Sequence, residues 1–91
     1  MTTSHKLTLF NIVLAQLTPY RKRLQHKCQL KIQFISWDNF DDRIEISLMR
    51  FGDDGHITKY DWLTYNLNIP SERNINAFID EAVEKIKPFI H

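Results

Sequence analysis

A histidine and the single cysteine of the chain, His26 and Cys28, lie two residues apart. This spacing can supply two zinc ligands, but a closed zinc site needs four, and the other three histidines show no paired spacing. Cys28 is in phase with the apolar residues Leu30 and Ile32, so we expect it to pack as a small apolar side chain. The sequence therefore predicts neither a metal site nor thiol chemistry.

Residues with side-chain oxygen atoms gather in two predicted turns: Asp38, Asn39, Asp41 and Asp42 in the first, and Asp53 and Asp54 in the second. A calcium loop needs oxygen ligands at alternate positions, a central glycine and a distant glutamate, and neither turn has this spacing. The two glycines, Gly52 and Gly55, both belong to the second turn, so no glycine-rich phosphate loop is present. We expect no enzyme activity, no cofactor and no small-molecule substrate.

Charges are segregated along the chain. The first 37 residues contain no acidic residue and six cations, and all 11 acidic residues follow them. Cations at such spacing can contact successive phosphates or an acidic protein. The alternative is that these cations form the solvated C-terminal end of the first helix, where they suit the negative end of the helix dipole. The acidic half of the chain would then offset their charge. The candidate contact residues are Arg21, Lys22, Arg23, Lys27 and Lys31.

The N-terminal quarter predicts a kinked helix over about residues 5–25, with a strand over Leu7–Phe10 as the alternative. Its apolar residues recur at helical spacing, and Pro19 interrupts the pattern because its ring clashes with the preceding turn. A second short helix can restart at Thr18-Pro19. The predicted buried stripe is Leu7, Phe10, Leu14, Leu17 and Leu24, broadened by Val13 and Tyr20.

Three strands follow. Residues 28–34 and 43–49 alternate between apolar and polar side chains, and residues 57–65 form the third strand. A three-residue loop, 53–55, would place Gly55 in the left-handed region that glycine tolerates. This register buries Tyr60 and Trp62, whereas a four-residue loop would bury charged residues instead.

The last element is a helix. Pro70 ends the preceding extended segment, Ser71 can cap the helix, and Glu72 suits its first turn. Its predicted apolar stripe is Ile75, Phe78, Ile79, Ala82, Ile86 and Phe89. The chain is thus expected to be a single α+β domain over residues 1–91. A three-stranded antiparallel meander stands between two helices, and both helices cover one sheet face in a two-layer sandwich.

The outer face of this sheet is predicted to be unusually apolar. An exposed antiparallel face is normally polar, so large apolar side chains there indicate an interaction surface. Loops or the segment 66–69 covering part of the face are the alternative. The candidate protein-binding residues are Ile35, Trp37, Met49, Phe51, Ile57 and Leu63.

The order helix–three strands–helix resembles that of the double-stranded-RNA-binding domain. That family implies a lysine-rich start to the second helix, whereas Ser71, Glu72, Arg73 and Asn74 stand at the corresponding positions here. No RNA-binding residue is therefore carried over. Small phage-encoded inhibitors, including some anti-CRISPR proteins, are similar in using compact folds of this order. Both resemblances concern the fold, which does not imply function.

We therefore expect a non-catalytic protein-binding module that self-associates or docks on a partner, such as an inhibitor or regulator encoded by a phage or mobile element. The alternative is a nucleic-acid binder that uses residues 21–31. Burial of Tyr60 and Trp62 would weigh against it, because base stacking needs exposed aromatic side chains. The uncharged run from Leu7 to Tyr20 is shorter than the about 20 apolar residues that span a bilayer. A cytoplasmic location without a membrane partner is therefore expected.

Overall fold

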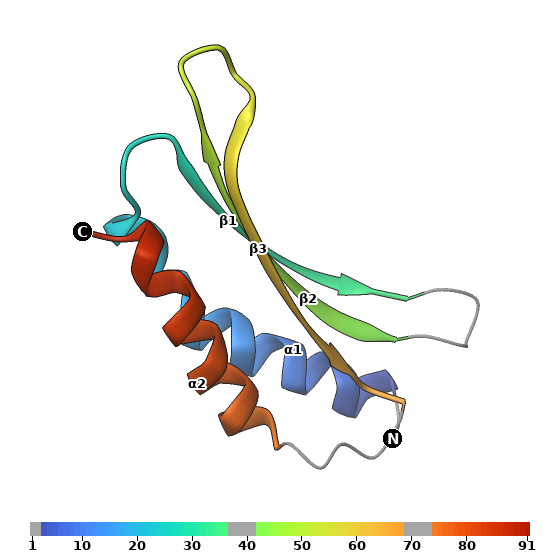
Figure 1. The fold of residues 1–91 in the computed structure, drawn as a ribbon. Coiled ribbons are helices and arrows are strands. Elements are labelled where there is room, and N and C mark those ends of the chain that lie inside the picture. Colours follow the sequence, from blue (N-terminus) through green and yellow to red (C-terminus); the bar gives the residue numbers. More distant parts are fainter. Residues whose placement is uncertain (1–2, 37–41, 69–73) are drawn as a thin grey trace.

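The computed structural model describes residues 3–36, 42–68 and 74–91. Its elements, in chain order, are α1 (Thr3–Leu17), the 3₁₀ helix η1 (Thr18–Arg23), β1 (Cys28–Ile35), β2 (Arg43–Phe51), β3 (Ile57–Asn66), α2 (Ile75–Ile86) and the 3₁₀ helix η2 (Lys87–Phe89). The strands form an antiparallel sheet in the order β1-β2-β3, and both helices lie against one of its faces (Figure 1). The predicted two-layer α+β fold is confirmed.

The core lies between the sheet and the helices. Leu30 pairs with Leu48 and Ile32 with Ile46, so the alternation of β1 and β2 directs their apolar residues toward the helices as predicted. All of these side chains are buried. Helix α2 contributes the predicted stripe, of which Phe78, Ile79, Ala82 and Ile86 are buried.

Helix α2 begins later than the sequence predicted. Its N-cap is Asn74, whose side chain accepts a hydrogen bond of 2.8 Å from the backbone N–H of Ala77. The predicted cap Ser71, together with Glu72, lies outside the described residues. At the other end the helix passes into η2, which buries Phe89 as predicted.

Helix α1 ends close to Pro19, where the sequence predicted an interruption. The α-helix ends at Leu17, and η1 carries Pro19 at its start. Val13 and Leu17 are fully buried. Leu7 was predicted to belong to the buried stripe, which is wrong: its side chain is 44% exposed. The side of α1 that packs on the core is therefore centred nearer Val13 than predicted, and Leu7 lies outside it.

The β2–β3 hairpin has the predicted three-residue loop. The backbone N–H of Gly52 donates to the carbonyl of His56 over 2.8 Å, which closes the turn. The N–H of Gly55 donates to the carbonyl of Gly52 over 3.0 Å, and the φ of Gly55 is 83°. Gly55 thus occupies the left-handed region that glycine adopts without cost.

We expect Gly55→Val to lower the free energy of unfolding by about 1–2 kcal/mol, because a β-branched residue is strained at positive φ. A Cβ added at this position would meet no atom within 4 Å, so the loss would be conformational and not steric. Urea denaturation followed by circular dichroism measures it. Gly55→Asn is the matched control, since asparagine tolerates this region; equal losses for the two variants would contradict the explanation.

A β-bulge changes the faces of β3. Phe51 pairs with Ile57, but the next pair is Arg50 with Lys59, so Thr58 is an extra residue opposite a continuous β2. The hydroxyl of Thr58 donates to the carbonyl of Arg50 over 3.2 Å across the bulge. From Lys59 onward, every side chain consequently points to the face opposite the one that an unbroken register gives.

The predicted register of β3 is therefore wrong beyond the turn. Leu63 and Tyr65 face the helices and are buried, whereas Tyr60 and Trp62 point away from them and are 51% and 55% exposed. The ring of Tyr65 lies 5.2 Å from that of Phe78, centroid to centroid. The bulge places this packing in the core while leaving Ile57 on the outer face.

The charged residues that the register brings to the helix side have partners at the edge of the core. The Nζ of Lys59 lies 5.1 Å from the centre of the Phe89 ring. Asp61 forms an ion pair of 3.4 Å with Lys85 of α2. Sequence reasoning rejected the register that turns Lys59 and Asp61 toward the helices, because both are charged. In the structure each has a partner there, so the register is compatible with their charges.

A polar network joins α1 to the start of β2 and the end of β3. The Nζ of Lys6 on α1 donates to Asp42, before β2, over 2.7 Å and to Asn68, after β3, over 2.6 Å. The Lys6 and Asp42 side chains are only 12% and 14% exposed. The hydrogen bond from Lys6, followed by one from the Ser36 hydroxyl, lowers the pKa of Asp42 below its ordinary value.

Acid should weaken the protein through Asp42. A carboxyl whose pKa is lowered on folding stabilises the native state above its unfolded pKa of about 3.9. That stabilisation disappears as pH falls through the lowered folded pKa. We expect the thermal midpoint of the wild type to fall more steeply below pH 4 than that of Asp42→Asn, as measured by melts across pH. Parallel curves for the two proteins would refute the contribution of Asp42.

Candidate interaction surfaces

The outer face of the sheet carries a contiguous row of apolar and aromatic side chains. Cross-strand pairs place Phe51 beside Ile57 and Met49 beside Tyr60, and Trp62 follows beside Ser47. We call this set the outer-face strip: Met49, Phe51, Ile57, Tyr60 and Trp62. Both helices lie on the opposite face of the sheet (Figure 1). The strip thus runs along the hairpin on the side that the described helices leave uncovered.

The structure rearranges the predicted protein-binding set. Ile35, Met49 and Phe51 are half-buried at outer-face positions, and Ile57 is exposed there. Leu63 does not belong to this face, because the bulge turns it into the core, where it is 8% exposed. Trp37 lies outside the described residues.

Tyr60 and Trp62 are the residues that sequence reasoning missed. Period-two alternation assigns them to the face that the turn dictates, and a bulge is not visible in that alternation. One signal was available: Leu63 and Tyr65 are continued by Leu67, which is buried as well. Three apolar residues at alternate positions leading toward α2 indicate the buried face better than the turn does.

A shallow hollow of about 360 Å³ lies beside the aromatic pair. It is lined by Arg43, Glu45, Tyr60, Trp62 and Thr64. Arg43 and Glu45 form an ion pair of 3.8 Å within it. Ser47, between Lys31 and Trp62, is only 7% exposed although it is on the outer face. Larger neighbours overhang this small residue, so the centre of the face is recessed.

The predicted basic residues are not brought together. Arg21, Lys22 and Arg23 are exposed on η1, in the helix layer. Lys27 forms an ion pair with Asp53 of the hairpin loop. Lys31 lies on the outer sheet face, in the same cross-strand row as Trp62. The chain therefore has a cationic η1 and a separate lysine beside the outer-face strip.

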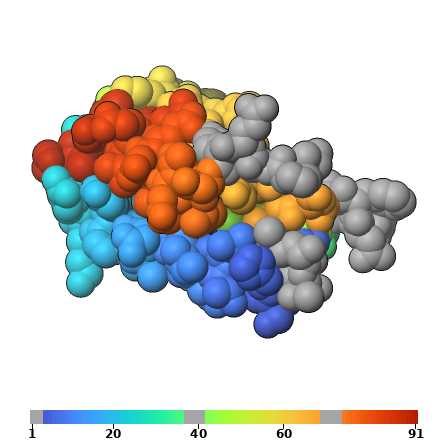
Figure 2. All heavy atoms as spheres, turned by 90° about the horizontal axis from the view of Figure 1, so that it is seen from below, coloured from blue at the N-terminus to red at the C-terminus, as the bar shows by residue number. Residues whose placement is uncertain are grey.

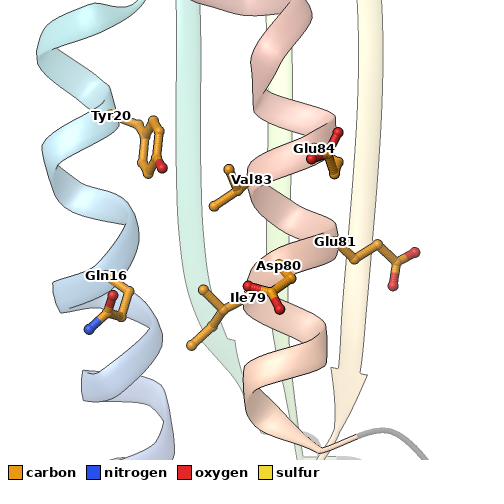
Figure 3. A pocket seen from close by; sticks show the side chains of 7 residues that line it. All are labelled: Gln16, Tyr20, Ile79, Asp80, Glu81, Val83 and Glu84. Atoms are coloured by element: carbon orange, nitrogen blue, oxygen red, sulfur yellow. The ribbon is translucent and has the colours of Figure 1, made fainter.

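A second hollow, of about 480 Å³, lies between the two helices. Gln16 and Tyr20 form one wall, and Ile79 and Val83 of α2 point toward them from the other (Figure 3). Carboxylates of α2 border the hollow, although Glu81 points away from α1 (Figure 3). This groove is open, and its walls mix polar and apolar side chains beside an acidic margin.

Within the described ranges, no three histidine, cysteine, aspartate or glutamate side chains are grouped so as to hold a metal ion. Cys28 is half-buried and His26 is exposed. No helix among the described residues is both long enough and apolar enough to cross a membrane. Comparison of the chain with models of protein families, with curated proteins and with solved structures found no match.

Proposed function

We propose that this chain is a non-catalytic protein-binding module that docks its partner on the outer-face strip. The observation that carries the proposal is the exposure of Tyr60 and Trp62, each more than half exposed, beside Met49, Phe51 and Ile57. Tryptophan, tyrosine and methionine are the residue types enriched at the centres of protein interfaces. An apolar face of this kind suits an inhibitor or regulator, which acts by occupying a surface.

The composition of the face favours a protein over other partners. A contiguous apolar strip is desolvated when another apolar surface covers it, and each large side chain buried contributes about 1.5–3 kcal/mol. Lys31 and the Arg43–Glu45 pair stand around the strip and supply the polar rim of an interface.

Single-stranded nucleic acid is the second candidate, because Trp62 lies in one cross-strand row with Lys31. Aromatic side chains beside cations are the platform on which bases stack. In the described part of the chain, however, the cations of this face are Lys31 and Arg43, and Arg43 is paired with Glu45. Its positive charge is therefore small, which favours the protein partner.

We expect weak or no binding of single-stranded or duplex oligonucleotides at physiological ionic strength. Nucleic-acid affinity comes largely from counterion release, which requires several free cations on one surface. Fluorescence anisotropy titrations at several salt concentrations measure this. Tight binding that falls steeply with salt and disappears in Trp62→Ala would promote the second candidate above the first.

The strand itself supplies a matched control for the protein-binding test. Tyr60→Ala/Trp62→Ala alters two outer-face side chains, whereas Lys59→Ala/Asp61→Ala alters two neighbours that point to the helix side. A protein that co-purifies with the wild type is expected to be lost from the first variant and retained by the second. Titration of that purified protein should give the same order of affinities. Equal binding by both variants would contradict the proposal.

A further inference from the structure

The solvent side of α1 carries no charge over its central turns. No charged residue occurs from Leu7 to Tyr20. Leu7 is 44% and Ile12 39% exposed, and Thr8, Asn11 and Ala15 are exposed as well. A helix that is uncharged and partly apolar all round is typical of helices covered on both sides. Among the described elements, the sheet and α2 cover one side of α1, and none covers its other side.

Helix α2 presents a different surface beside it. Its exposed ridge carries Asp80 and Glu84, and α1 and α2 lie side by side on the same face of the molecule (Figure 2). Among the described residues, Asp80 forms no ion pair, and Glu84 pairs with Lys87 over 2.6 Å. The ridge thus has one carboxylate, that of Asp80, with no cationic partner among the residues that the structure describes.

The opposite charge stands at the end of the neighbouring helix. Arg21, Lys22 and Arg23 of η1 are exposed, and none of them forms an ion pair within the described part of the chain. Hydrogen bonds join this end to the C-terminus, with the N–H of His91 donating to the carbonyl of Arg23 over 3.0 Å. The helix layer therefore carries exposed cations on η1 and exposed carboxylates on α2.

We propose that this layer binds a second copy of the chain. In a two-fold dimer each surface is used twice, so the uncharged side of α1 becomes buried in both copies. The η1 cations of each copy then face Asp80 and Glu84 of the other. The groove between Tyr20 and Val83 accepts an apolar side chain of the second copy. This surface is distinct from the outer-face strip, so one dimer presents two strips to its partners.

Charge reversal tests the pairing in both directions. We expect sedimentation velocity to show a wild-type dimer whose dissociation constant rises with salt, because the charge pairs are screened. Arg21→Glu/Lys22→Glu/Arg23→Glu and Asp80→Lys/Glu84→Lys should each be monomeric, with dissociation constants at least tenfold higher. A mixture of the two variants should dimerise again. Lys31→Glu, on the outer sheet face, is the control and should leave the dimer intact.

The proposal would be overturned by a wild type that remains monomeric at low salt, by a dimer that persists in either charge-reversed variant, or by two variants that remain monomeric when mixed. Far-UV circular dichroism and melts of each variant verify that it is folded. Ile12→Asp, which alters an exposed residue of α1, should also dissociate the dimer. A dimer lost in Trp62→Ala but retained in Ile12→Asp would place self-association on the sheet face, which would refute this inference and leave the proposed function standing.

Discussion

Phe78→Ala is expected to lower the free energy of unfolding by about 3–5 kcal/mol, through lost burial and the cavity that remains. Phe78 has no exposed surface and is, with Phe89, the largest of the fully buried side chains. It stands between the layers, with its ring 5.2 Å from that of Tyr65. Since small domains are stable by about 5–15 kcal/mol, this variant should be near the limit of folding. Urea denaturation followed by circular dichroism measures the loss.

Leu7→Ala is the control for this prediction. Leu7 is apolar but 44% exposed, so its truncation should cost under about 1 kcal/mol. Ile46→Ala, in the centre of the sheet, should cost about 2–5 kcal/mol. Similar losses for Leu7→Ala and Phe78→Ala would mean that the core does not lie between α2 and the sheet.

Trp62→Ala is expected to weaken binding of the protein partner by about 30-fold or more while leaving the fold intact. Central tryptophans of interfaces commonly contribute about 2 kcal/mol or more to binding, and about 1.4 kcal/mol corresponds to tenfold in affinity. Because Trp62 is 55% exposed, its truncation leaves no cavity in the core. Calorimetric titration with the purified partner gives the affinity, and thermal melts give the stability.

Asp61→Ala separates the role of Trp62 from a general effect on β3. Asp61 is the preceding residue, and its carboxylate pairs with Lys85 on the helix side. We expect this variant to change stability slightly and partner affinity hardly at all. If Trp62→Ala lowers stability as much as Ile46→Ala while affinity is retained, Trp62 has a structural role and the outer-face strip is not the docking surface.

The elements with simple periodicity could be predicted from sequence. Alternation of Leu30 with Ile32, and of Ile46 with Leu48, was sufficient for the first two strands, because each strand keeps one face buried along its length. The α2 stripe and the left-handed Gly55 follow from equally local rules. These are positions where propensity, pattern and packing agree.

Alternation placed Met49, Phe51 and Ile57 on the outer face, but it missed Tyr60 and Trp62, because their orientation depends on one unpaired residue. Thr58 adds a residue to β3 without altering the hairpin loop, and every later side chain changes face. Sequence reasoning compared two registers of β3, each with unbroken alternation. In the structure, the three-residue turn and the burial of Leu63 and Tyr65 occur together because Thr58 interrupts the alternation. Leu7 was misplaced for a related reason: α1 is apolar on several sides, so spacing alone does not identify the side that packs.

The most direct test of the docking surface is photo-crosslinking from Tyr60. A photo-reactive phenylalanine analogue in place of Tyr60 would lie on the exposed outer face, and irradiation in the producing cells would couple it to whatever covers that face. We predict a discrete adduct with one different protein, lost when Trp62→Ala is introduced into the same chain. No adduct, an adduct only with nucleic acid, or an adduct that persists in Trp62→Ala would contradict the assignment of the outer-face strip as a protein-binding surface.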